Sequence, residues 1–313
     1  MEFTLIDRIR RRAAGRGDVV LGIGDDAALL QPPAGMLLAV ATDTLNAGVH
    51  FPGDTPPADI GWKALAVNLS DLAAMGATPA WASLSLSLPA ADADWLDGFL
   101  DGFLALADAH DVALVGGDTT RGPLSVSVTV HGFVPPGAAL RRDGAQVGDD
   151  VWVTGTLGDA AAALALWRDG DADPVLRARL DRPVPRVEAG RALAGIAHAA
   201  IDISDGLLAD LGHLCAASGV GADIELGALP ASQALLARFD DEARASLQAT
   251  GGDDYELCFT APAMARTAIA SLAGVAITRI GRVVAGAGTA RALRGDGSAW
   301  VPVRAGYAHF EAR

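Results

Sequence analysis

The chain has 313 residues, and its 38 acidic and 24 basic side chains give it a formal net charge of −14. Its length suggests two domains, and a hydrophobic fraction of 51% excludes an intrinsically disordered chain. The acid excess argues against a protein that binds nucleic acid by neutralising many phosphates. We therefore expect a globular, cytoplasmic enzyme with no nucleic-acid partner.

The first predicted elements lie between residues 36 and 134. Apolar and alternating patterns predict strands over 36–42, 81–88, 112–115 and 124–134, and helical spacing predicts helices over 60–75 and 92–109. An uncharged run over 72–91 has the length of a membrane span. However, it contains Gly76, Pro79 and Pro89 and alternates with period two from Trp81 onward, so we predict no membrane partner.

The only lysine in the chain, Lys63, falls in the first of these helices. A P-loop needs G-x-x-x-x-G-K-[ST], and the surrounding sequence Gly-Trp-Lys-Ala over 61–64 does not fit it. A protein kinase needs its lysine on a strand, which excludes that arrangement as well. If the protein binds phosphate groups, their negative charge must therefore be neutralised by something other than a P-loop or protein-kinase lysine.

A turn-rich stretch over 134–148 predicts the boundary between two α/β domains, 1–137 and 148–313, each with a mixed sheet. In the second domain we predict strands over 151–154 and 199–203, a long loop over 170–186, and a helix over 206–217 with Asp205 as a possible N-cap. Cys215 and Cys258 lie far apart, which indicates two buried thiols and neither a zinc site nor a disulfide.

Aspartates recur next to glycine or hydroxyl residues where predicted strands end. Such groups occur at 22–26, 42–44, 116–118, 202–206 and 251–254, while Asn68 and Asp71 share a helix face. Each group alone is more often an ordinary turn or cap. Together they indicate a ligand site at the strand ends. Carboxylates in one cleft repel one another unless cations are present, and Asp suits Mg²⁺. The pattern predicts a site with several Mg²⁺ ions, which would replace the missing P-loop lysine.

Six segments follow one another along the chain: GIGDDAALL over 22–30, ATDTL over 41–45, KALAVNLSDLAAMGA over 63–77, GGDTTRG over 116–122, IDISDG over 201–206 and GGDDYEL over 251–257. In this order they resemble the thiamine-monophosphate kinase family, within the superfamily of aminoimidazole ribonucleotide synthetase, whose members bind ATP without a P-loop. The resemblance spans nearly the whole chain.

The resemblance implies the two-domain aminoimidazole ribonucleotide synthetase-like fold, an α/β fold of α+β type. Its N-terminal mixed sheet would bind ATP and Mg²⁺ and form a barrel across a homodimer, and its C-terminal α/β domain would complete the active-site cleft. The implied activity is ATP-dependent phosphorylation of thiamine monophosphate to thiamine diphosphate. The γ-phosphate would pass in line, with several Mg²⁺ ions assisting.

The same resemblance assigns roles to particular positions. The implied Mg²⁺ ligands are Asp26, Thr42, Asp43, Asp71, Asp118, Asp202 and Asp205, and the implied ATP contacts are Gly117, Asp118, Arg142 and Ser204. Thiamine monophosphate would contact His50, Asp253 and Tyr307, with Asp205 and Arg142 acting in catalysis. The chain departs from the family's pattern at Ala41, where some members have a hydroxyl residue, and at Asp253, where Glu is frequent.

Two alternatives stay open at this point. One is another ATP-using enzyme of the superfamily, similar to aminoimidazole ribonucleotide synthetase. The other is a non-catalytic nucleotide-binding relative, although such a protein would typically have lost several carboxylates, and here the set is full.

Overall fold

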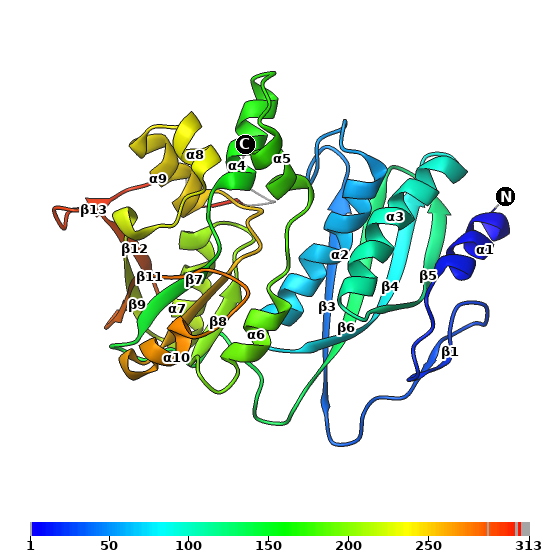
Figure 1. The fold of residues 1–313 in the computed structure, drawn as a ribbon, viewed down its shortest axis with the longest axis horizontal. Coiled ribbons are helices and arrows are strands. Elements are labelled where there is room, and N and C mark those ends of the chain that lie inside the picture. Colours follow the sequence, from blue (N-terminus) through cyan, green and yellow to red (C-terminus); the bar gives the residue numbers. More distant parts are fainter. Residues whose placement is uncertain (1, 287, 304–305, 308–313) are drawn as a thin grey trace. The chain divides into compact units, whose positions relative to one another are not determined.

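The computed structural model describes residues 2–286, 288–303 and 306–307. The chain forms two compact units: Met1–Leu72 with Ala77–Gly137, and Ala73–Gly76 with Ala138–Arg313. Figure 1 shows the elements of both units. Within the described residues, no helix combines the length and apolar character needed to cross a bilayer.

The first unit is built on a four-stranded mixed sheet with the order β3-β6-β4-β5 (Figure 1). Its strands are β3 (Leu37–Asn46), β4 (Thr78–Leu88), β5 (Ala113–Arg121) and β6 (Ser125–Val134), and only β4 and β5 pair in parallel. The unit also contains a small hairpin, β1 (Val19–Leu21) with β2 (Leu29–Leu30), and the helices α1 (Glu2–Arg12), α2 (Pro57–Ala74) and α3 (Ala93–Ala109).

One face of this sheet is buried and the other carries hydroxyl groups. Val126, Val128 and Val130 of β6 are fully buried, while the alternating Ser127 and Thr129 are partly exposed. Figure 1 shows α2 and α3 over one face of the sheet. The two strands with the cleanest alternation in sequence, β4 and β6, are neighbours at the centre of the sheet.

Two glycines let α2 and α3 approach closely. A Cβ atom on Gly61 of α2 would lie 2.0 Å from the backbone oxygen of Phe99, and one on Gly102 of α3 would lie 1.7 Å from that of Ala58. No side chain fits at either distance. The helical stripe of Phe99 and Phe103 is fully buried, as the sequence predicts for core residues.

The second unit has a seven-stranded mixed sheet with the order β13-β12-β9-β11-β7-β10-β8. Its strands are β7 (Asp150–Thr154), β8 (Ala199–Asp202), β9 (Gly221–Glu225), β10 (Leu257–Ala261), β11 (Ile277–Val284), β12 (Ala290–Leu293) and β13 (Ala299–Trp300). Its helices are α4 (Asp159–Arg168), α5 (Pro174–Asp181), α6 (Val187–Leu193), α7 (Leu207–Ser218), α8 (Gln233–Arg238), α9 (Asp241–Thr250) and α10 (Arg266–Ala270), with short 3₁₀ turns at Leu226–Ala228 and Ala263–Ala265.

Helix α7 forms the main core of this unit together with the sheet. Its residues Leu211, Leu214 and Cys215 join Ile201 of β8 and Cys258 of β10 in one buried cluster. Both cysteines are free and buried, which confirms the sequence prediction.

Three local predictions are wrong. The segments 42–44 and 116–118 lie inside β3 and β5 and do not follow strand ends. Both strands are sheet edges, where polar side chains keep contact with solvent, so turn-forming residues are tolerated within them. The segment 170–186 is not a long loop, because Asp173 caps the helix α5 by accepting N–H groups from Val175 and Leu176.

The packing of α2 on α3 gives a stability prediction with an internal control. We expect Gly102→Ala to destabilise the protein by about 1–3 kcal/mol, because the new methyl group must push the two helices apart. A Cβ atom on Gly212, inside α7, would meet no neighbour within 4 Å, so Gly212→Ala should stabilise the protein by up to about 1 kcal/mol. Urea unfolding of both variants measures these changes in stability. Equal unfolding midpoints would contradict the close packing of α2 on α3.

Candidate active site

Two segments of the second unit lie side by side beyond the ends of their strands. The N–H groups of Asp253 and Tyr255 donate to the backbone oxygens of Ser204 and Ile203, at 2.9 and 2.8 Å, and Ile203 N–H donates to the Glu256 backbone oxygen at 2.8 Å. These bonds continue the pairing of β8 with β10 past Asp202. They bring together four predicted site residues: Asp202, Ser204, Asp205 and Asp253.

Tyr307 joins this group through its backbone. Its N–H donates to the carbonyl oxygen of Asp205 at 3.0 Å, and 48% of the surface of the residue is exposed. Two residues predicted to contact thiamine monophosphate, Tyr307 and Asp253, are therefore both bonded to the 203–206 segment.

Asp210 is a member of this site that the sequence reasoning missed. Its carboxylate accepts N–H groups from Ser204, Asp205 and Gly206, at 3.0, 3.0 and 3.1 Å. The prediction that Asp205 is the N-cap of α7 is wrong, because the N-cap is Gly206, with no side-chain cap. Asp210 instead holds the backbone of the segment that leads into the helix. The available signal was an acidic residue in the first turn of a helix that follows a strand.

The electrostatics of Asp210 show how crowded these carboxylates are. Burial, followed by the neighbouring charges of Asp202 and Asp205, raises the pKa of Asp210 to about 7, although the N–H groups of Asp205 and Ser204 oppose the shift. A site that holds several carboxylates against one another in this way favours the binding of cations.

The 251–256 segment has a constrained backbone. Asp253 and Tyr255 have φ values of 68° and 49°, in the left-handed region that side chains other than glycine rarely adopt. The Tyr255 hydroxyl donates to Asp253 Oδ1 at 3.1 Å. Each such residue costs on the order of 1 kcal/mol, and the cost is tolerated where surrounding contacts fix the backbone.

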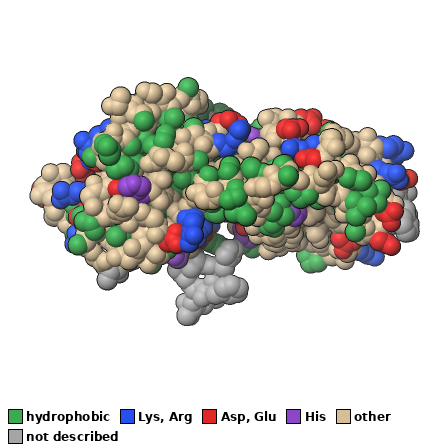
Figure 2. All heavy atoms as spheres, turned by 90° about the horizontal axis from the view of Figure 1, so that it is seen from below, with side chains coloured by type: hydrophobic (Ala, Val, Ile, Leu, Met, Phe, Trp, Pro, Cys, Tyr) green, Lys and Arg blue, Asp and Glu red, His purple; other side chains and the backbone are tan. Residues whose placement is uncertain are grey.

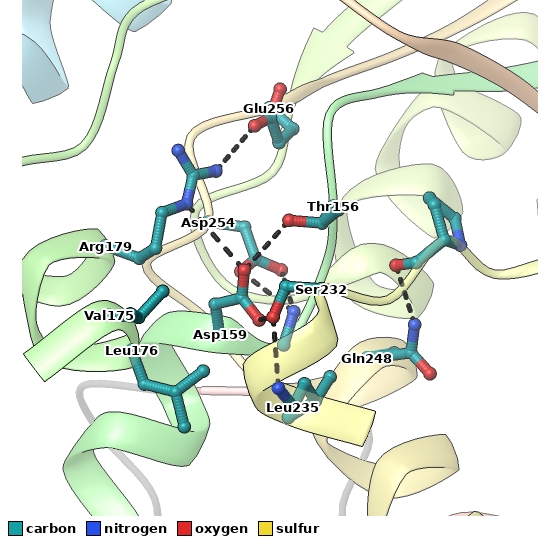
Figure 3. A network of polar contacts seen from close by, with 12 residues as sticks. Thr156, Asp159, Val175, Leu176, Arg179, Ser232, Leu235, Gln248, Asp254 and Glu256 are labelled. Atoms are coloured by element: carbon teal, nitrogen blue, oxygen red, sulfur yellow. Dashed lines mark hydrogen bonds and ion pairs between the residues drawn. The ribbon is translucent and has the colours of Figure 1, made fainter. Parts of the chain in front are cut away.

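A buried polar network supplies those contacts (Figure 3). The Glu256 side chain is fully buried and accepts from Arg179 of α5 at 2.7 Å, Arg186 Nε at 2.6 Å and Thr154 at 2.7 Å. Both oxygens of Asp254 accept the Gly158 N–H at 3.0 Å, and burial raises the pKa of Asp254. The network ties α5 and the start of α4 to the segment that carries Asp253.

Arg142 lies away from these residues. It is exposed, and its backbone oxygen accepts from the hydroxyl of Ser218, the last residue of α7, at 2.7 Å. Asp205 precedes the first residue of the same helix. Since α7 has 12 residues, its rise places the two backbones roughly 18 Å apart.

In the first unit, β3 and α2 bring several predicted residues together. The Asp43 N–H donates to Asn68 Oδ1 at 2.9 Å, and Asp71 lies one helical turn beyond Asn68. Thr42 shares a hydroxyl hydrogen bond of 2.8 Å with Thr129 of β6. His50 follows β3 in a turn, where its Nδ1 accepts the Asn46 N–H at 2.9 Å. Asp26 is exposed, in the connection between β1 and β2.

The remaining residues, Gly117 and Asp118, occupy the opposite edge of the sheet. Asp43 pairs with Val128, Val128 with Leu84, and Leu84 with Gly117. Asp43 and Gly117 therefore lie at the same level, three strand spacings or about 14 Å apart. Across the part of the chain that the structure describes, no three His, Cys, Asp or Glu side chains are placed to hold a metal ion.

Gly117 is needed where it lies. Its φ is 141°, and a Cβ atom there would be 1.8 Å from the backbone oxygen of Leu84.

A cavity of about 400 Å³ opens farther along β5, lined by Leu5, Leu88, Pro89, Ala90, Ala91, Thr119, Thr120 and Arg121. It is mainly apolar, with hydroxyl groups and one cation at its β5 side.

Comparison with known proteins gives a consistent result. Residues 24–134 match the family model of the AIR synthase related protein N-terminal domain, and residues 146–293 match that of the C-terminal domain. Thiamine-monophosphate kinase of Salmonella typhimurium is 50% identical over 299 residues, which cover 91% of this chain and 90% of the relative.

Solved structures agree with the sequence comparison. The crystal structure of thiamine-monophosphate kinase from Stenotrophomonas maltophilia K279a is 57% identical with a TM-score of 0.89, covering 96% of this chain and 98% of that one. The structure of AaThiL complexed with AMPPCP and TMP is 34% identical with a TM-score of 0.78, covering 99% and 97%.

The raised pKa of Asp210 gives a pH prediction for the metal-free protein. Asp210 keeps its proton up to about pH 7 in the folded chain but loses it near 3.8 in the unfolded chain. At Asp210 the unfolded state thus binds fewer protons between these values, so the contribution of Asp210 to the free energy of unfolding falls as pH rises from 4 to 7. We expect this fall to be on the order of 1–3 kcal/mol in the wild-type protein. The Asp210→Asn variant should not show it.

Denaturant unfolding between about pH 4 and pH 8 in a chelating buffer measures this difference. The control is Asp241→Asn, because Asp241 is 97% exposed at the side chain and should give a curve parallel to wild type. If the Asp210→Asn variant also gave a curve of unfolding free energy against pH that runs parallel to wild type, the raised pKa of Asp210 would be contradicted.

Proposed function

Because the chain belongs to the thiamine-monophosphate kinase family, we propose that it transfers the γ-phosphate of ATP to thiamine monophosphate, giving thiamine diphosphate and ADP. The observation that carries this proposal is the pairing of the 203–206 segment with the 251–256 segment, which joins Ser204, the neighbour of Asp205, to Asp253. The similarity to AaThiL complexed with AMPPCP and TMP supports the same two kinds of ligand here.

The chemistry of the acceptor fits a site without a general base. A phosphate monoester carries about −1.5 to −2 charges near pH 7, so its oxygen is already a nucleophile. The obstacle is the repulsion between two polyanions that must meet in line. We infer that the residues of this chain act mainly by orienting both phosphates and offsetting their charge.

Mg²⁺ fits the residues that would hold it. The proposed ligands are hard oxygen donors: Asp26, Thr42, Asp43, Asp71, Asp118, Asp202 and Asp205. Burial, followed by the charges of Asp202 and Asp205, raises the pKa of Asp210, and bound cations would relieve the part of this effect that comes from the neighbouring charges. When bound, Mg²⁺ would neutralise phosphate charge, a task for which this chain offers no P-loop lysine.

The remaining residues divide between the two substrates. For ATP we propose contacts from Gly117, Asp118, Arg142 and Ser204, with the purine in the cavity beside Thr119 and Thr120. For thiamine monophosphate we propose His50, Asp253 and Tyr307, since a carboxylate and an aromatic ring suit the positive thiazolium. We propose that Asp205 acts at the reacting phosphates as a Mg²⁺ ligand. Arg142, whose backbone lies roughly 18 Å from that of Asp205, would approach the phosphates of ATP from a different side and supply a cation that does not titrate.

We propose a homodimer that completes the site. Hydrophobic side chains gather on the surface shown in Figure 2, and exposed ones in the first unit include Leu37, Leu38 and Val40 of the edge strand β3. Two copies that pair β5 with β3 would cover such edges and form a barrel. That pairing would also bring Asp118 of one subunit level with Asp43 of the other.

The free thiols of Cys215 and Cys258 fit a reducing compartment. We propose that the reaction takes place in the cytoplasm.

The test of the activity compares acceptors. Protein, ATP and Mg²⁺ are incubated with thiamine monophosphate or with free thiamine, and ADP and thiamine diphosphate are separated by chromatography. We expect both products in equal amounts with the monophosphate alone. ADP without thiamine diphosphate would favour another ATP-using enzyme of the superfamily, and ATP binding without turnover would favour a non-catalytic relative.

Asp205→Asn tests the catalytic assignment. We expect kcat to fall by roughly 100-fold or more, because the Asp205 carboxylate would no longer help to hold Mg²⁺ at the reacting phosphates, while far-UV circular dichroism stays unchanged. The exposed Asp241→Asn serves as the control, with a rate within about twofold of wild type. A normal kcat for Asp205→Asn would contradict its role.

Subunit complementation tests the shared site. Asp43→Asn and Asp118→Asn should each be inactive, but a refolded mixture should regain about a quarter of wild-type activity, since about half of the dimers are mixed and each has one intact site. A mixture of Asp43→Asn with Asp71→Asn should regain none, because β3 and α2 hold both residues on one side of a site. If both mixtures regained the same activity, or if neither regained any, the proposed pairing of β5 with β3 across the dimer would be contradicted.

A further inference from the structure

Lys63 is buried in α2, and only 1% of its surface is exposed. Lysine is almost never fully buried without a polar partner, because the ammonium loses its hydration. Its Nζ donates to the backbone oxygen of His50 at 2.9 Å. No phosphate motif accounts for this side chain, although it is the only lysine in the chain.

The partner of Lys63 lies in a tightly bonded turn. The N–H groups of Val49 and His50 both donate to the Asn46 oxygen at 3.1 Å, and Gly48 N–H donates to the Phe51 oxygen at 3.2 Å. The Asn46 N–H donates to His50 Nδ1 at 2.9 Å. Since Nδ1 is an acceptor there, the neutral imidazole carries its proton on Nε2. The turn therefore fixes the tautomer and the ring orientation of His50.

Lys63 connects this turn to α2, the helix that also carries the proposed metal ligand Asp71. Farther along α2, Asn68 accepts the Asp43 N–H from β3. The same helix is thus bonded to β3 at Asp43 and to the following turn at His50. A hydrogen bond from an ammonium to a carbonyl is stronger than a neutral one, so it sets the position of His50 relative to Asp43.

We propose that Lys63 is a positioning residue for the phosphate acceptor: its ammonium holds the backbone of His50, and thereby the imidazole, in place for thiamine monophosphate. This inference rests on the proposed function, in which His50 contacts the acceptor. If Lys63 were only a core residue, its loss would change stability without changing the affinity for one substrate.

Steady-state kinetics of Lys63→Met tests the proposal. Methionine keeps the length of the side chain but cannot donate, so we expect the KM for thiamine monophosphate to rise about tenfold and the KM for ATP to stay within about twofold. Lys63→Arg retains a donor and should recover part of the loss. The control is Leu65→Val, a buried truncation on a different side of α2, which should lower only the unfolding midpoint.

An unchanged KM for thiamine monophosphate in Lys63→Met, or an equal rise in both KM values, would overturn the positioning role. His50→Ala separates this failure from that of the proposed function. An unchanged acceptor KM in His50→Ala would reject His50 as a contact, and with it the role of Lys63. A wild-type protein that forms no thiamine diphosphate would reject the activity itself.

A measurement on the wild-type protein does not depend on whether the variants fold. Because Lys63 is the only lysine, protein grown with [ε-¹³C]lysine gives one side-chain NMR signal. We expect thiamine monophosphate to shift this signal in a saturable way. A signal that stays in place at saturating thiamine monophosphate would overturn the proposal.

Discussion

The candidate site in the second unit depends on one backbone interaction, the pairing of the 203–206 segment with the 251–256 segment. The register of β8 with β10 continues beyond Asp202 through the bonds of Asp253 and Tyr255 to Ser204 and Ile203. This pairing places residues proposed for the nucleotide next to a residue proposed for the acceptor. It also requires a left-handed backbone at Asp253, which the buried network around Glu256 holds in place.

The two groups of carboxylates in this arrangement differ in how their charge is compensated. Around Glu256 the buried carboxylate is compensated within the protein, by Arg179 and Arg186. Around Asp210, Asp202 and Asp205 the carboxylates face one another, and the pKa of Asp210 rises as a result of burial and of these charges. The ion pairs of Glu256 are therefore part of the folded structure itself. The carboxylates around Asp210 are suited to binding cations. Lys63 belongs with the first kind, since its ammonium is buried and donates to a backbone oxygen of the protein.

Much of the fold could be predicted from the sequence because its signals are local. The alternation in β4 and β6 and the spacing in α2, α3 and α7 follow from which face is buried. Polar motifs were harder to place: Thr-Asp-Thr and Gly-Gly-Asp have turn-like compositions but lie inside edge strands. Asp210 lies within a mainly apolar helix, so the sequence pattern does not mark it as a site residue. The sequence also does not show that Arg142 and Asp205 lie at opposite ends of α7. The side-by-side placement of 203–206 and 251–256 depends on strand order, which spacing alone does not give.

In the proposed reaction, the γ-phosphate passes directly from ATP to thiamine monophosphate. The most direct measurement follows the label from [γ-³²P]ATP in the presence of Mg²⁺ and the acceptor. We expect label to appear in thiamine diphosphate in an amount equal to the ADP formed, with none in inorganic phosphate. Label released as inorganic phosphate, with thiamine monophosphate unchanged, would contradict it.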